Sequence, residues 1–245
     1  MSWARLLSVC LVAVVAVCVF GPGMVEAATV TWTGGGDGVS WSHAPNWSSN
    51  PNLPGSGDDV CISADADIMM DVGSFGTPDV IKSLTVNGGA GTPSLLFEEG
   101  KGLRIEGDFM NCDADPEDRF PVTLEGGSKL QVVGDGGEEI LGTIVDIAIT
   151  LESASPSAPT VLSAYSVDDG VYAVGSNCDV TLTSAEASSD WEVDGGNLRI
   201  YGLEYEASET GDVLVKNEGT LTLSGESGRL DGSKLVADNL ETRSG

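Results

Sequence analysis

Tryptophan residues are the first feature of this sequence that suggests a chemistry. Trp32, Trp41 and Trp47 lie close together, and Trp191 stands alone in the second half of the chain. The flat apolar face of a pyranose packs well on an indole ring, so Trp41, Trp47 and Trp191 are candidate sugar-binding residues. The alternative for the first three is a hydrophobic lid over one end of the fold, and for Trp191 it is simple packing. We favour these structural interpretations.

Clusters of carboxylates suggest a second chemistry, the binding of a hard cation. Ca²⁺ takes several oxygen ligands from flexible loops, so calcium is the candidate cofactor. The densest cluster lies in one expected loop and consists of Asp113, Asp115, Glu117 and Asp118. A second group contains Asp65, Asp67 and Asp71. Neither group has the spacing of an EF-hand loop, so a solvated acidic loop is the favoured alternative.

Catalytic chemistry has weaker support. His43 is the only histidine, which restricts imidazole-based metal sites and nucleophilic triads to a single residue. A polysaccharide lyase needs a basic residue to abstract a proton, for which Arg104 and Arg199 are candidates, and a glycoside hydrolase needs a pair of carboxylates. An acidic cleft would repel an anionic polysaccharide. We therefore expect a protein that is not an enzyme.

The charge of the chain excludes two classes of partner. Its formal net charge is −27 at pH 7, so it is repelled by nucleic acids and by anionic membrane surfaces. The three cysteines beyond the first 27 residues, Cys61, Cys112 and Cys178, are too few and too scattered for a disulfide framework. We expect them to be small buried side chains, with one disulfide as the alternative.

The first 27 residues have the composition of a signal peptide. A short basic start is followed by an apolar run from Leu6 to Phe20 and by small residues before position 28. The run is shorter than a membrane-spanning helix, and no second run follows it. We therefore predict a secreted or cell-surface protein with no membrane span after removal of residues 1–27.

The rest of the chain has the pattern of an all-β protein. Short aliphatic runs alternate with polar residues and are separated by Gly, Asn-Gly and Pro turns. The segment Ile140–Leu151 is so rich in β-branched residues that we expect one or two strands there. A triplet of an aliphatic residue, any residue and a second aliphatic residue recurs from Leu84 to Ala237 at irregular spacings near twenty residues. Such a repeat is typical of a parallel β-solenoid, with a β-sandwich as the alternative.

The segment that precedes this repeat has the features of a cap. Trp32, Trp41 and Trp47 supply apolar area, while Pro45, Pro51, Pro54 and the glycines at 34–38 shape the path. The order of Trp32, Gly34, Gly35, Trp41, Asn46-Trp47, Pro54 and Asp58-Asp59-Val60 resembles the N-terminal motif of bacterial autotransporter-type, passenger-associated β-helix repeat proteins. This resemblance implies a right-handed parallel β-helix that is exported and displayed or released, usually without a known reaction.

Together these features give a prediction for the whole chain. Residues 1–27 are a signal peptide, 28–57 an N-terminal Trp-rich cap and 58–245 a parallel β-solenoid. The expected role is that of a non-catalytic structural or adhesive module that contacts an extracellular glycan or a surface protein. The alternatives are a carbohydrate-active β-helix, either a lyase or a hydrolase, and a carbohydrate-binding module.

Overall fold

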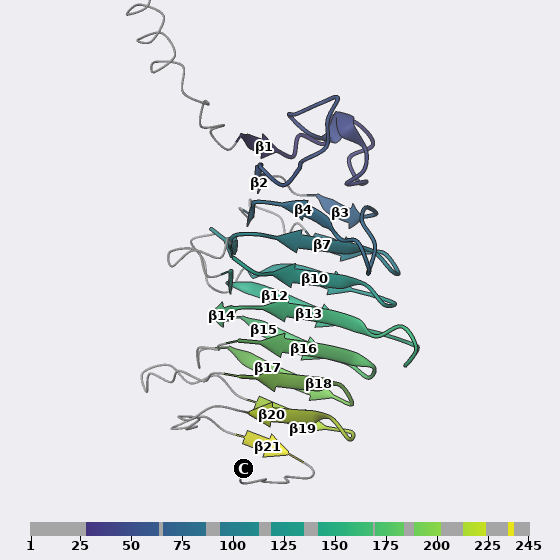
Figure 1. Cartoon of the computed structure of the whole chain (residues 1–245), viewed down its shortest axis with the longest axis vertical. Helices are drawn as coiled ribbons and strands as arrows, with labels where there is room; N and C mark the ends of the chain where they lie inside the picture. The colour runs from purple at the N-terminus through teal and green to yellow at the C-terminus, as the bar shows by residue number, and fades with distance from the viewer. Residues whose placement is uncertain are drawn as a thin grey trace, which may run out of the picture.

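A stack of short strands makes up the computed structural model of the protein (Figure 1). The structure describes residues 28–63, 66–86, 94–112, 119–134, 142–168, 170–183, 189–201, 213–223 and 235–237. The predicted signal peptide, residues 1–27, lies outside the described residues. All strand pairs are parallel in the described part of the chain.

The strands form three sheets, which we number by the order in which the chain reaches them. Sheet 1 contains β1 (Thr29–Thr31), β2 (Asp59–Ile62), β5 (Ser83–Val86), β8 (Phe109–Asn111), β11 (Thr143–Val145) and β14 (Ser166–Asp168). Sheet 2 contains β3 (Asp67–Met70), β6 (Ser94–Phe97), β9 (Phe120–Leu124), β12 (Ile147–Leu151), β15 (Val171–Val174), β17 (Asp190–Asp194), β19 (Val213–Lys216) and β21 (Leu235–Ala237). Sheet 3 contains β4 (Asp79–Ile81), β7 (Gly102–Ile105), β10 (Lys129–Val132), β13 (Thr160–Ala164), β16 (Cys178–Leu182), β18 (Asn197–Ile200) and β20 (Thr220–Leu223).

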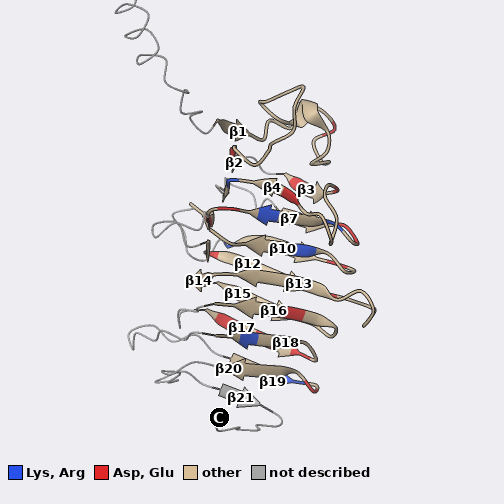
Figure 2. Ribbon diagram, in the orientation of Figure 1, with Lys and Arg blue, Asp and Glu red and all other residues tan. Residues whose placement is uncertain are grey.

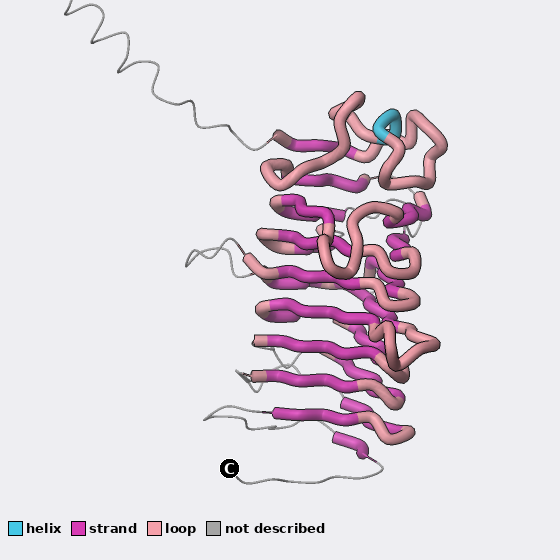
Figure 3. Tube along the Cα trace, turned by 45° about the vertical axis from the view of Figure 1, so that its right-hand side comes forward, coloured by secondary structure: helices cyan, strands magenta, loops and turns pink. Residues whose placement is uncertain are grey.

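The chain visits the three sheets in rotation. From β2 to β16 each successive strand belongs to the next sheet, so one full turn adds one strand, or rung, to every sheet. After β16 the described strands alternate between sheets 2 and 3. Figure 3 shows these rungs as layers, with the turns gathered at the corners between sheets. The prediction of an all-β, parallel β-helix is confirmed.

The core consists of inward side chains stacked rung upon rung. In sheet 3 the register aligns Leu103, Leu130, Leu162, Val180 and Leu198, all of them buried. The stack explains why the triplet repeats in the sequence, because one coil alone cannot bury its inward residues. Polar or small residues occupy the alternate, outward positions of the same strands, except for Val161 in β13.

The structure shows which strands form in two segments where the sequence pattern was ambiguous. The widest gap between the triplets, from Leu130 to Val180, holds a further unit at Leu162-Ser163-Ala164 in β13. The segment expected to form one or two strands forms two, β11 and β12. They are separated by Asp146, whose φ of 56° turns the chain from sheet 1 to sheet 2.

The predicted cap covers the first rung by extending two of the sheets. β1 pairs with β2 and is thereby already the first strand of sheet 1. The backbone of Val39–Trp41 extends sheet 2, because Met69 donates to the Val39 carbonyl and Trp41 donates to the Met69 carbonyl, both at 2.9 Å. A single 3₁₀ turn, η1 (Ala44–Asn46), lies within the cap. The cap thus pairs edge groups that would otherwise be open to another chain.

The burial of the three cysteines matches the expectation only in part. All three are free: Cys178 is buried, Cys61 is half-buried and Cys112 is exposed. The expectation of a small buried side chain is confirmed for Cys178 and wrong for Cys112. Burial, followed by the nearby charge of Asp179, raises the pKa of the Cys178 thiol to about 11. That thiol is therefore protonated at neutral pH and inert.

Candidate functional site

The three cap tryptophans form one buried cluster. Trp32, Trp41 and Trp47 have at most 3% of their surface exposed. Trp47 meets both partners edge to face, with ring centroids 4.8 Å from Trp32 and 4.6 Å from Trp41. The Trp47 indole N–H donates to the Trp41 carbonyl at 2.8 Å. Burial leaves no ring face open to a pyranose, which argues against the sugar-stacking role considered for Trp41 and Trp47 and favours the lid interpretation.

Trp191 is also buried, with 4% of its surface exposed. It points inward from β17 and stacks on Tyr172 of β15, with ring centroids 4.2 Å apart. The same burial argues against the sugar-binding role considered for Trp191. The alternation Asp190-Trp191-Glu192-Val193 placed this residue on the same face as Val193, which is the signal for its inward position.

The polar residues of the cap hold its loop together. The buried side chain of Asn46 accepts hydrogen bonds from the Gly36 and Gly38 amides, at 2.9 and 3.0 Å, and donates to Asp37 at 2.7 Å. Asp37 also accepts from the Val39 and Ser40 amides, and these hydrogen bonds hold its pKa well below the ordinary range.

His43 belongs to the same structural network. Its Nδ1 atom accepts a hydrogen bond from the Asp37 amide at 3.2 Å. The same atom lies 3.3 Å from the Asp37 carboxylate, and both side chains are partly exposed. These contacts give His43 a role in shaping the loop.

Only some of the candidate calcium-binding residues lie within the described part of the chain. The cluster of Asp113, Asp115, Glu117 and Asp118 lies outside the described residues, as does Asp65. Asp67 accepts a hydrogen bond from Ser94, and Asp71 accepts two from Ser42. Within the described ranges, no group of three or more His, Cys, Asp or Glu residues is arranged to hold a metal ion. The calcium site therefore stays a prediction.

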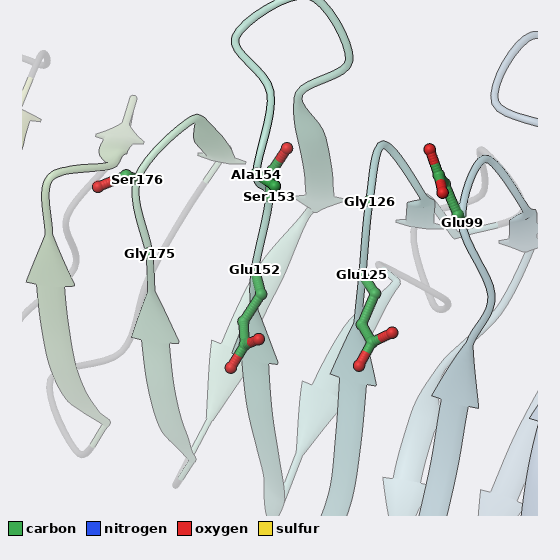
Figure 4. Close-up of a pocket in the computed structure, with 8 residues that line it drawn as sticks. All are labelled: Glu99, Glu125, Gly126, Glu152, Ser153, Ala154, Gly175 and Ser176. Carbon is green, nitrogen blue, oxygen red and sulfur yellow. The ribbon is translucent and has the colours of Figure 1, made fainter.

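An open pocket of about 530 Å³ lies along the turns that lead from sheet 2 to sheet 3. Glu99, Glu125, Glu152 and Ser176 are among the residues that line it (Figure 4). The turns are stacked by their backbones, since Gly100 donates to the Gly126 carbonyl and Gly126 donates to the Glu152 carbonyl, each at 3.1 Å. This stacking places one acidic turn directly above the next.

Two carboxylates of this pocket lie side by side. Leu124 and Leu151 are register partners, so Glu125 and Glu152, which follow them, occupy the same place on adjacent rungs, about 4.8 Å apart along the axis. Both side chains are exposed and extend in the same direction in Figure 4, whereas Glu99 extends away from them. A glycosidase needs carboxylates that flank the scissile bond, with different environments for acid and base. Glu125 and Glu152 occupy equivalent, exposed positions on adjacent rungs, so the register itself gives them no difference in environment.

The two residues considered as the base of a lyase lie on the same face of sheet 3, but they are far apart. Arg104 and Arg199 occupy the same outward column of sheet 3, as their equivalent places in the repeat indicated. Four rungs separate them, which is a distance of about 19 Å. Arg104 Nε also lies 3.6 Å from a Glu106 carboxylate oxygen. The two guanidinium groups are therefore too far apart to act on one glycosidic bond.

The exposed aromatic residues are ones that the sequence analysis did not select. In the part of the chain that the structure describes, Phe75, Tyr165 and Tyr201 are exposed at 38%, 37% and 54%. Tyr165 and Tyr201 each follow the second aliphatic residue of a triplet in sheet 3. Aligning the sequence one residue beyond each triplet would have found both tyrosines at one repeat position.

Comparison with known proteins does not assign this chain to a family. No family model, no curated protein and no solved structure matches this chain. Among the described residues, the structure has no helix with the length and apolar character needed to span a membrane.

Proposed function

We propose that this protein is an exported, non-catalytic β-helix that serves as a structural or adhesive module at the cell surface or outside the cell. Export is proposed from the composition of residues 1–27, and the resemblance of the cap motif to autotransporter-type passengers agrees with it. The partner would be an extracellular glycan or a surface protein. A nucleic acid is disfavoured by the net charge of −27.

The arrangement of Glu125 and Glu152 is the observation that carries the non-catalytic part of the proposal. The two carboxylates are exposed, equivalent by register and parallel, and the pocket beside them is open. General acid–base catalysis needs two groups whose surroundings give them different roles. Repeated equivalent positions on a rigid ladder instead suit a surface that contacts a partner many times.

A carbohydrate-active enzyme is the second candidate, and the pocket along the acidic turns favours it. Glu125 and Glu152 would be its carboxylates, and Arg104 or Arg199 would be the base of a lyase. Calcium would then neutralise a uronate substrate, with Asp113, Asp115, Glu117 and Asp118 as candidate ligands. The equivalence of the two glutamates and the separation of the arginines argue against this function.

The test is a combined binding and product assay. The purified protein is incubated with neutral, uronate-containing and sulfated polysaccharides, with added Ca²⁺ and with a chelator. Retention on a polysaccharide without release of shortened or unsaturated products supports the adhesive module. Released products that disappear in a Glu125→Gln, Glu152→Gln double variant would overturn the proposal and establish an enzyme. Loss of retention with the chelator would assign a role to calcium.

A further inference from the structure

Tyr165 and Tyr201 lie in one column at the carboxyl ends of sheet-3 strands. Tyr165 follows β13 and donates its backbone N–H to the Val132 carbonyl at 3.1 Å. Tyr201 follows β18 and donates to the Leu182 carbonyl at 3.0 Å. Thr183, after β16, occupies the rung between them and donates to the Ala164 carbonyl. The ladder of sheet 3 is thus continued through these three positions.

The spacing of the two tyrosines follows from the ladder. They are two rungs apart, which corresponds to about 10 Å along the axis of the β-helix. In Figure 1 the strands β13, β16 and β18 that carry this column lie side by side on one face. A rigid sheet therefore holds two partly exposed phenol rings at a fixed separation, with a small Thr side chain between them.

Polar side chains accompany the tyrosines on the same face. Ser163, Thr181 and Arg199 occupy the outward column two residues before the tyrosine column, roughly 7 Å away along each strand. Further along the face, Asn197 donates a hydrogen bond of 2.9 Å to Asp179. The face combines aromatic rings with hydroxyl, amide and guanidinium groups, which are the groups that hydrogen-bond sugar hydroxyls.

The negative net charge of the protein favours uncharged glycans over anionic glycans as ligands. On this face β16 carries one acidic residue, Asp179, and β18 one basic residue, Arg199 (Figure 2), while the chain as a whole carries −27. A polyanion such as a sulfated or uronate-rich chain is repelled at long range, whereas an uncharged chain is not. The partner chemistry that fits is therefore a neutral polysaccharide.

We propose that Tyr165 and Tyr201 bind a neutral, extended polysaccharide chain along the β-helix axis, each ring stacking on one of two alternate sugar units. In an extended β-linked chain alternate units present the same face, and each unit is similar in length to one rung. The unit between them lies over Thr183, and the column of Ser163, Thr181 and Arg199 donates hydrogen bonds to the hydroxyl groups. This inference rests on the proposed adhesive function and names its ligand class.

The test measures depletion of the purified protein from solution by insoluble neutral polysaccharides, namely cellulose, chitin and β-1,3-glucan, with pectate as the anionic comparison. Tyr165→Ala and Tyr201→Ala should each weaken binding to a neutral polymer roughly tenfold, because one stacking contact is lost. Tyr165→Phe and Tyr201→Phe keep the ring and should bind within about twofold of the unchanged protein. Circular dichroism of every variant checks that the fold is retained.

Phe75→Ala is the matched control, because Phe75 is about as exposed as Tyr165 and lies in the turn before β4, at the opposite end of the sheet-3 strands from the tyrosines, where it packs under the Lys129 ammonium group. It should leave binding unchanged. The inference is overturned if no neutral polymer is bound, if the alanine variants bind normally, or if Phe75→Ala has the same effect as Tyr201→Ala. Retention that survives the loss of both tyrosines would overturn this site and leave the adhesive function standing, whereas released products would overturn the function itself.

Discussion

The rings of Tyr172 and Trp191 stack face to face inside the β-helix, with centroids 4.2 Å apart and an angle of 15° between their planes. The two residues are register partners on β15 and β17. Because the rung spacing is close to the stacking distance of two aromatic rings, the ladder itself sets up the contact. Trp191 therefore uses its ring face within the core, where a sugar cannot reach it.

Gly170→Ala should destabilise the protein through this stack. A methyl group at Gly170 would overlap the ring of Tyr172, which is fully buried and held by Trp191. Overpacking of this kind costs about 1–3 kcal/mol in the free energy of unfolding, measured by urea denaturation. Gly76→Ala is the control, since the added methyl group meets nothing within 4 Å, and it should change stability by less than ~0.5 kcal/mol. Equal stabilities for the two variants would contradict the packing argument.

Trp47→Ala should remove much of the cap's stability. The Trp47 ring fills the space between Trp32 and Trp41, so its loss leaves a cavity. This cavity should lower the free energy of unfolding by about 3–5 kcal/mol. Trp47→Phe keeps part of that volume and loses the hydrogen bond to the Trp41 carbonyl, so its effect should be smaller. Tyr201→Ala, which truncates an exposed ring, is the control for aromatic loss in general. An unchanged unfolding midpoint for Trp47→Ala would mean that the lid interpretation is wrong.

The fold was predictable because the solenoid repeats its own pattern. Triplets such as Leu103-Arg104-Ile105 and Leu198-Arg199-Ile200 belong to one sheet, and their alternation indicated which residues point inward. The sequence does not show to which of the three sheets a triplet belongs, however, because the inward aliphatic residues follow the same pattern in all three sheets. The triplet at Leu84 lies in sheet 1 and that at Leu235 in sheet 2, although both resemble those of sheet 3.

The candidate site was less predictable, for a physical reason. Sugar stacking needs an exposed ring, and residue type alone does not give exposure: the tryptophans of the cap are buried while Tyr165 and Tyr201 are not. The proximity of Glu125 and Glu152 is also a property of register, because 27 residues separate them in the chain and one rung separates them in space. Only the lengths of the intervening turns decide which residues become neighbours.

Asp79→Asn should stabilise the protein at neutral pH. Asp79 begins β4 at the edge of sheet 3, and its burial raises its pKa above the ordinary 3.8, although a hydrogen bond from the Val80 amide opposes the shift. A raised carboxyl pKa means that the folded state binds the proton more tightly, so stability falls as pH rises through the folded pKa. The variant should therefore have a higher urea midpoint at pH 7, and the difference should vanish below pH 3.8. Glu99→Gln, which removes an exposed charge, controls for net charge; a larger gain there would contradict the role of burial.

Glu125→Gln should raise stability at low salt because Glu125 is the middle member of a column of like charges. Phe97, Leu124 and Leu151 are successive register partners, so the glutamates that follow them, Glu98, Glu125 and Glu152, stand on adjacent rungs. Like charges at directly opposite positions repel, and removing the central one should contribute up to ~1 kcal/mol in urea denaturation. The gain should shrink in 1 M salt, because screening weakens the repulsion.

The matched control for this column is Glu192→Gln, which should change stability in the opposite direction. Glu192 lies on an outward position of the same sheet, but its carboxylate is 2.6 Å from the Lys216 ammonium group. Neutralising it removes an attraction instead of a repulsion, and salt should again reduce the effect. If Glu125→Gln lowered the urea midpoint as Glu192→Gln does, Glu125 would have an attractive partner such as a bound cation. The acidic turns would then have to be treated as a binding site, and the enzyme alternative would regain support.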